Sequence, residues 1–95
     1  MILSSYPTID LHGCDRDYAV YLVKDFINDN YKLQKHTIVI IHGIGNGILK
    51  NAVHKHLRNN HLVKEFRVDV INTGCTIVNL NRNQKLNYQS LIFFI

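Results

Sequence analysis

The hydrophobic pattern in the first half of the chain predicts a strand, a helix and a second strand. Residues 8–12 alternate between apolar and polar positions, as a half-buried strand does, and Gly13 ends the alternation. Asp15 can cap a helix that ends near Asn30. The apolar stripe of this helix consists of Ala19, Leu22, Val23, Phe26 and Ile27. Residues 37–41 are all β-branched, which is typical of a strand covered on both faces.

The second half of the chain predicts another helix and two more strands. A second helical stripe begins after Gly47 and closes at residues 59–60. Its members are Leu49, Ala52, Val53, His56 and Leu57. Residues 63–71 then predict a third strand, 72–75 a turn and 76–80 a fourth strand. The resulting order is βαβαββ, so the fold class is α/β.

Topology should bring three strand ends to one edge of the sheet. Strand–helix–strand crossovers are right-handed, so the first three strands should run in one direction and share the edge where they end. His12 ends the first of these strands, His42 ends the second, and the turn at 72–75 follows the third. Asp10 lies two residues before His12, on the same side of its strand. Ligand sites in open α/β sheets lie at such an edge.

The sequence HGIGNG at 42–47 joins the second strand to the second helix. Glycines leave backbone N–H groups accessible, and the N-terminus of the following helix adds partial positive charge, so the loop is a candidate anion cradle. The alternative is a tight connection without a ligand. Gly43, Gly45 and Gly47 are spaced GxGxG, which fits neither the dinucleotide fingerprint nor a P-loop. NAD and ATP are therefore poor candidates.

Composition predicts one small basic domain. The chain has 95 residues, of which 46% are hydrophobic, enough for a single modest core. We expect a domain at 1–80 and a separate tail at 81–95. Eleven Lys and Arg against seven Asp and Glu give a net charge of +4, which favours nucleic acid as partner, although it also aids solubility.

Further sequence features bear on compartment and metal binding. No apolar run is long enough to span a bilayer, and the start does not resemble a signal peptide, so we expect a cytoplasmic protein with no membrane partner. Cys14 and Cys75 are too few for a disulfide framework. A zinc site formed by His12, Cys14 and His42 is a weaker alternative, because HxC is an unusual ligand spacing. We therefore predict no protein metal site of this kind.

Four segments of the chain are informative together: IDLHG at 9–13, IIHGIGNGILKNAVHKHL at 40–57, VKEF at 63–66 and GCTIVNL at 74–80. They resemble the Smr domain, the small MutS-related module, and especially the version that ends bacterial MutS2 proteins. The resemblance implies a two-layer α/β sandwich with a four-stranded mixed sheet, similar to the C-terminal domain of translation initiation factor three. It also implies nucleic-acid binding, and several family members nick DNA or cleave RNA.

The resemblance assigns roles to residues at the shared edge. It places the catalytic signature on Asp10 and His12, to which His42 is added as a second acid–base candidate. The predicted phosphate-binding set is His42, Gly43, Gly45, Asn46, Gly47 and Lys50. Imidazoles titrate near about pH 6.5 and can act as acid and base, while Asp10 can orient an imidazole or hold a Mg or Mn ion. The alternative is that both histidines only hydrogen-bond phosphate.

We therefore expect a DNA or RNA endonuclease. The alternatives are a non-catalytic nucleic-acid or ribosome-associated adaptor and a small-anion or metal-binding domain. Lys50, His54, Lys55 and Arg58 avoid the apolar stripe of their helix, so we expect them to face solvent, where they could follow a nucleic-acid backbone. The apolar run LIFFI at 91–95 should dock on the sheet or on a second copy, giving a monomer or a weak homodimer, and the alternative is a disordered chain end.

Overall fold

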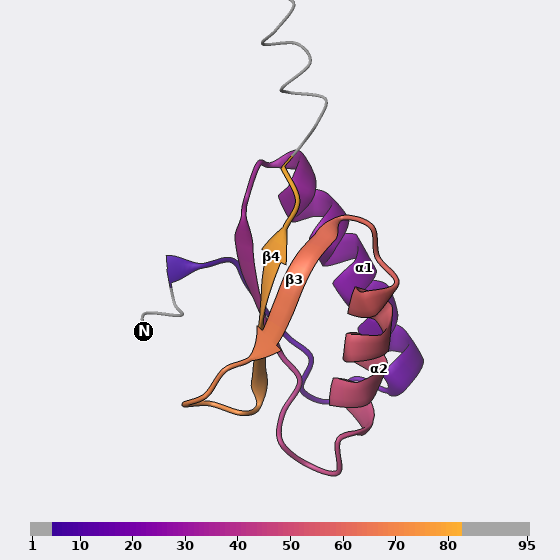
Figure 1. The fold of residues 1–95 in the computed structure, drawn as a ribbon. Helices are drawn as coiled ribbons and strands as arrows, with labels where there is room; N and C mark the ends of the chain where they lie inside the picture. The colour runs from indigo at the N-terminus through magenta and orange to yellow at the C-terminus, as the bar shows by residue number, and fades with distance from the viewer. Residues whose placement is uncertain (1–4, 83–95) are drawn as a thin grey trace, which may run out of the picture.

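A computed structural model describes residues 5–82 of the protein. It has the predicted βαβαββ order (Figure 1). The elements are β1 (Thr8–Asp10), α1 (Arg16–Lys32), β2 (Thr37–Ile41), α2 (Ile48–Arg58), β3 (Val63–Val68) and β4 (Cys75–Leu80). The predicted tail docking at 91–95 lies outside the described residues. Within residues 5–82, neither helix is long and apolar enough to cross a membrane.

The four strands form one mixed sheet in the order β1-β2-β4-β3. β1 and β2 are parallel, whereas β4 runs antiparallel to both β2 and β3. β1, β2 and β3 consequently share one direction, as predicted, although β4 separates β3 from β2. Both crossovers move the same way across the sheet, so right-handed connections place both helices on one face (Figure 1). The predicted two-layer α/β sandwich is confirmed.

The core lies between the helices and the sheet. Its buried members are Leu11, Ala19, Val23, Ile27, Ile38, Ile40, Val53, Leu57, Val78 and Leu80. The two predicted helical stripes supply five of these side chains, while Leu22, Phe26 and Leu49 are partly buried at the border of the core. In β2, Ile38, Val39 and Ile40 are all buried, which confirms a strand covered on both faces. Burial of each large side chain stabilises the fold by about 1.5–3 kcal/mol.

β1 ends earlier than its alternating pattern predicted. It stops at Asp10 instead of His12, although Leu11 still donates its N–H to the carbonyl of Ile41 at 2.9 Å. The Asp10 carboxylate then accepts the backbone N–H of His12 at 2.9 Å. This local bond competes with sheet pairing and turns the chain, so His12 lies in a loop.

β3 also ends earlier than predicted, at Val68 instead of residue 71. The buried carboxylate of Asp69 accepts the N–H of Asn72 at 3.2 Å and closes a turn. Val70 and Ile71, which the pattern assigned to the strand, are 85% and 81% exposed in that turn. Their β-branched side chains suggested a strand that the neighbouring Asp and Asn residues prevent.

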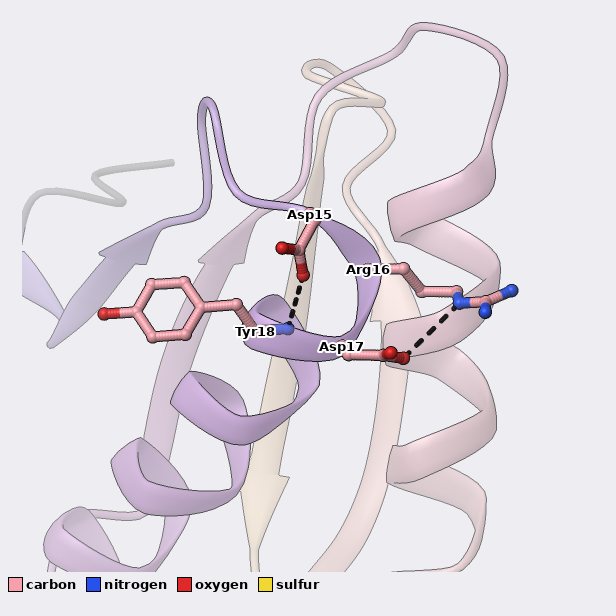
Figure 2. Close-up of polar contacts among 4 residues, drawn as sticks. All are labelled: Asp15, Arg16, Asp17 and Tyr18. Carbon is pink, nitrogen blue, oxygen red and sulfur yellow. Dashed lines mark hydrogen bonds and ion pairs between the residues drawn. The ribbon is translucent and has the colours of Figure 1, made fainter.

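α1 begins with the predicted Asp15 cap. The carboxylate of Asp15 accepts the N–H of Tyr18 at 2.8 Å, and Asp15 itself has extended backbone angles (Figure 2). Arg16 and Asp17 also form an ion pair, with Nε and Oδ1 3.6 Å apart (Figure 2). Both of these side chains are largely exposed, so the ion pair contributes little beside the cap.

Removing the cap should destabilise the domain measurably. Asp15→Ala leaves an N-terminal N–H of α1 without its acceptor, which costs about 1 kcal/mol of folding free energy. For a domain of this size, the melting temperature should then fall by about 4–8 °C. Asp15→Asn keeps an acceptor oxygen and serves as the control. Equal melting temperatures for Asp15→Ala and the unchanged protein would show that the bond contributes nothing.

Candidate functional site

The loops that follow β1 and β2 meet in a cleft of about 250 Å³. Its lining residues are Asp10, His12, Gly13, Ile41, His42, Gly43 and Leu49. Three segments contribute them: the end of β1 with the β1–α1 loop, the end of β2 with the glycine loop at 42–47, and the start of α2. The three residues predicted to be catalytic therefore lie together, as the topology indicated. Their roles stay predictions.

Besides a hollow of about 480 Å³ next to Lys24 and His61, two still larger hollows lie away from this cleft. One, of about 790 Å³, lies over the helices beside Arg16, Ile48 and Lys55. The other, of about 670 Å³, lies at the opposite edge of the sheet and includes His36 and Lys64. Neither combines the aspartate, the histidines and the glycine loop. We therefore take the smaller cleft, which holds these groups together, as the candidate functional site.

Asp10 and His12 present polar groups to this cleft. One carboxylate oxygen of Asp10 accepts the His12 backbone N–H, so the side chain of Asp10 also shapes the turn. The His12 side chain is exposed, and its ring makes no hydrogen bond to any residue between 5 and 82. An imidazole with both nitrogens unengaged can hydrogen-bond a ligand or exchange a proton with it.

The glycine loop needs its glycines for backbone conformation. Gly43, Gly45 and Gly47 have φ angles of 84°, 25° and 83°, in the left-handed region that other residues rarely adopt. A Cβ atom at Gly43 or Gly45 would meet nothing within 4 Å. The loop therefore requires glycine at these positions for its backbone angles, and not because a side chain would clash.

This geometry leaves several backbone amides at the start of α2 without an acceptor. Gly47, the N-cap of α2, offers no side chain, and the Asn46 side chain instead accepts the N–H of Ile48 at 3.1 Å. In the described part of the chain, the N–H groups of Gly45, Leu49 and Lys50 have no acceptor. Together with the helix dipole, such groups favour an anion.

The β3–β4 turn supports the glycine loop from beside it. The carbonyl of Gly74 accepts the N–H groups of His42 and Gly43, both at 3.0 Å. A Cβ atom at Gly74 would lie 3.3 Å from the Gly43 backbone, so the two segments approach closely. The amide of Gly43 is thus committed to the fold, although Gly43 was predicted to contact phosphate. Its contribution to the predicted cradle is its backbone conformation.

His42 is held by hydrogen bonds at both ring nitrogens. Nδ1 lies 2.9 Å from the carbonyl oxygen of Gly43, and Nε2 lies 2.7 Å from Oγ1 of Thr76. His54 reaches the same Thr76 oxygen through its own Nε2, at 2.8 Å. The rings of His42 and His54 meet edge to face with centroids 5.8 Å apart, and His54 also packs on Phe66 at 5.0 Å.

The expected solvent-facing position of His54 is therefore wrong. A signal was available, because Lys50, Val53, His54 and Leu57 are spaced i, i+3, i+4 and i+7 and share one face of α2. Thr76 was missed because a threonine at the start of a buried strand looks like an ordinary strand residue. His56, expected to be partly buried and structural, is partly buried and contacts Asn60 at 3.1 Å.

Burial and nearby cations keep the paired histidines neutral. Burial lowers the pKa of His42, and the positive charge of Lys50 lowers it further against the opposing effect of the Gly43 carbonyl. Burial likewise lowers the pKa of His54, with contributions from His42, Lys50 and Arg58. Burial together with Asp69 and Asp10 raises the pKa of the Cys75 thiol, so this thiol stays protonated.

Acid should destabilise the domain through its buried histidines. His42, His54 and His56 all have a pKa lowered by burial, whereas in the unfolded chain they titrate near their ordinary value of 6.5. Below that value the unfolded chain binds more protons, so stability is fully present above about pH 6.5 and falls as the pH drops.

The melting temperature should therefore decrease between pH 7.5 and pH 5.5. His54→Phe keeps an aromatic ring on α2 and removes one titrating group, so it should reduce this pH dependence. A melting temperature that stays constant, or that rises toward pH 5.5, would contradict the assignment of neutral buried histidines.

A zinc site is not supported at the cleft. Among residues 5–82, no three His, Cys, Asp or Glu side chains converge closely enough to hold a metal ion. The described residues therefore give no support to the alternative based on His12, Cys14 and His42. Both Cys14 and Cys75 are free thiols.

The fold and the cleft define a class of small two-layer α/β domains in which a glycine loop and a strand-end Asp-x-His pair share one sheet edge. The family model described as the Smr domain matches residues 9–81. The chain belongs to the Smr domain family, and the resemblance stated from the sequence is confirmed. The likeness to translation initiation factor three stays a prediction.

Related proteins and structures agree with this family. Endonuclease MutS2 of Caldanaerobacter subterraneus is 37% identical over 78 residues, covering 79% of this chain and 10% of that protein. Endonuclease MutS2 of Clostridium acetobutylicum is 34% identical over 76 residues, covering 77% of this chain and 10% of that protein. The match thus spans about a tenth of these relatives.

Solved structures show the same fold. The Smr domain of Thermus thermophilus MutS2 superposes with a TM-score of 0.77 at 27% identity, covering 79% of this chain and 98% of that chain. YdaL, a stand-alone small MutS-related protein from Escherichia coli, superposes with a TM-score of 0.76 at 21% identity, covering 85% of this chain and 72% of that chain. The YdaL comparison supports the fold alone.

Proposed function

We propose that this domain binds nucleic acid at the cleft and cleaves phosphodiester bonds there. The observation that carries the proposal is the position of Asp10 and the unengaged His12 imidazole in one cleft beside the glycine loop. Membership of the Smr family supports it, as does similarity to proteins named Endonuclease MutS2. We propose a cytoplasmic location together with this function.

The cleft offers complementary groups for a phosphodiester. The amides of Gly45, Leu49 and Lys50 and the helix N-terminus would stabilise phosphate charge as it accumulates in the transition state. The positive charge of Lys50 lowers the pKa of His42, which lines the cleft, so this charge would also act on a phosphate bound there. His42 lines the cleft, but both of its ring nitrogens already have protein partners.

His12 transfers the proton in this proposal, and Asp10 supports the step. In RNA the 2′-hydroxyl is an internal nucleophile, and His12 would accept its proton. In DNA the nucleophile is an external water: Asp10 would orient that water or hold a divalent cation such as Mg²⁺ or Mn²⁺, and His12 would accept the proton of the water. In both cases solvent water would protonate the leaving oxygen. The Asp10 carboxylate is an oxygen ligand of the kind that these ions prefer.

A binding role without cleavage is the second candidate. The engagement of both His42 nitrogens favours it. Of the two imidazoles that line the cleft, only His12 is without a hydrogen-bond partner among the described residues, whereas acid–base cleavage uses two proton-transfer groups. Such a domain would act as a nucleic-acid or ribosome-associated adaptor.

Labelled RNA and DNA of one sequence, incubated side by side with and without chelator, separate these candidates. Cleavage by the unchanged protein and its loss in His12→Ala would support the proposed nuclease. Binding without cleavage of either strand would favour the adaptor. Absence of salt-sensitive binding to both strands would contradict both candidates.

A further inference from the structure

A chain of three hydrogen bonds connects α2 to the glycine loop across β4. It runs from His54 to the Thr76 hydroxyl at 2.8 Å, from Thr76 to His42 at 2.7 Å, and from His42 to the Gly43 carbonyl at 2.9 Å. Thr76 is fully buried and His42 is 7% exposed. The chain joins residues that are 22 and 34 positions apart in sequence.

The direction of each hydrogen bond follows from donor and acceptor chemistry. The Gly43 carbonyl only accepts, so Nδ1 of His42 must carry hydrogen. Because His42 is neutral at pH 7, its Nε2 is an acceptor and takes the single proton of the Thr76 hydroxyl. Thr76 can then only accept from His54, whose Nε2 must carry hydrogen. The arrangement has one consistent set of tautomers.

This chain fixes one peptide plane in the loop. The described chain has no cis peptide bonds, and in a trans peptide the carbonyl and the following N–H point in opposite directions. Because the Gly43 carbonyl is tied to the His42 ring, the N–H of Ile44 points away from that ring. Ile44 is 70% exposed, and in the described residues its N–H has no acceptor.

We propose that Thr76 and His54 are positioning residues of the glycine loop, which hold the His42 ring so that the Gly43–Ile44 peptide directs its N–H toward a bound phosphate. The role of the phosphate rests on the proposed function. Packing of His54 on Phe66 steadies the far end of the chain. A rotated peptide would present the carbonyl oxygen of Gly43 instead and repel the phosphate.

The positioning role can be tested on the free protein by nitrogen-15 NMR of the imidazoles. We expect His42 as the Nδ1–H tautomer and His54 as the Nε2–H tautomer at pH 7.5. Thr76→Ser keeps the hydroxyl and should keep both tautomers. Thr76→Val has a similar shape but lacks the hydroxyl. It should shift the NMR signal of the Ile44 amide, and His42 should no longer be present as a single tautomer. An Nε2–H tautomer of His42 in the unchanged protein would overturn the proposal without any variant.

Binding of a labelled oligonucleotide gives the second readout. Thr76→Val leaves the buried Nε2 of His42 without a donor and should weaken affinity about tenfold, while Thr76→Ser restores it. Unchanged affinity and an unchanged Ile44 amide in a folded Thr76→Val protein would overturn the positioning role. If the unchanged protein binds no nucleic acid, the proposed function fails. The tautomers of His42 and His54 would still show whether the His42 ring holds the Gly43–Ile44 peptide.

Discussion

Gly45→Asp should weaken nucleic-acid binding by at least about tenfold, which corresponds to about 1.4 kcal/mol. Gly45 lies in the glycine loop with a φ of 25°, and its N–H has no acceptor within the described residues. A carboxylate there would occupy the position proposed for phosphate and repel the incoming charge. The affinity should be measured by fluorescence anisotropy at several salt concentrations, because phosphate contacts depend strongly on salt.

Two controls separate a local effect from a general electrostatic one. Gly45→Asn has nearly the shape of Gly45→Asp and tolerates similar backbone angles, but carries no charge, so it should lose much less affinity. Lys64 lies at the sheet edge opposite the cleft. Lys64→Glu changes the net charge by two, whereas Gly45→Asp changes it by one. A larger loss in Lys64→Glu than in Gly45→Asp would indicate diffuse attraction to a basic protein and no specific cradle.

Asp10→Ala and His12→Ala should each reduce cleavage by about 10²–10⁴-fold, the range for a lost proton-transfer group. Much of the binding should remain, because the amides of the loop and of the α2 N-terminus are unchanged. Single-turnover cleavage and binding measured on the same oligonucleotide would separate these effects.

Asp10 needs its own control, since its carboxylate also accepts the His12 N–H. Asp10→Asn keeps an acceptor oxygen and removes the charge, so it should keep the turn and still lose cleavage. Cleavage that survives in both Asp10→Asn and His12→Ala would remove these residues from the mechanism. With RNA, cutting at a 2′-deoxy sugar would exclude the internal nucleophile.

The fold could be predicted from the sequence because its signals are local and agree with one another. The stripes on α1 and α2 have clear helical spacing, and the β-branched run of β2 has no helical alternative of sufficient length. The strand ends were less predictable. At Asp10 and Asp69 a side-chain oxygen captures a backbone N–H and turns the chain where the apolar pattern would continue the strand.

The site was predictable in position and less so in its hydrogen bonding. Right-handed crossovers bring the ends of β1 and β2 together, so Asp10, His12 and His42 share a cleft. The link from His42 through Thr76 to His54 depends on how α2 packs over β4, which no local pattern reveals. The commitment of the Gly43 amide to Gly74 likewise depends on the approach of two distant turns.

Amide NMR of the nitrogen-15-labelled protein, titrated with a short oligonucleotide, tests most directly whether nucleic acid binds at this cleft. The largest shifts should fall on the amides of Ile44, Gly45, Leu49 and Lys50 and on the β1–α1 loop at His12 and Gly13. The amides of His36, His61 and Lys64 at the opposite edge should move little. Shifts concentrated on that opposite edge, or spread evenly over the surface, would contradict nucleic-acid binding at this cleft.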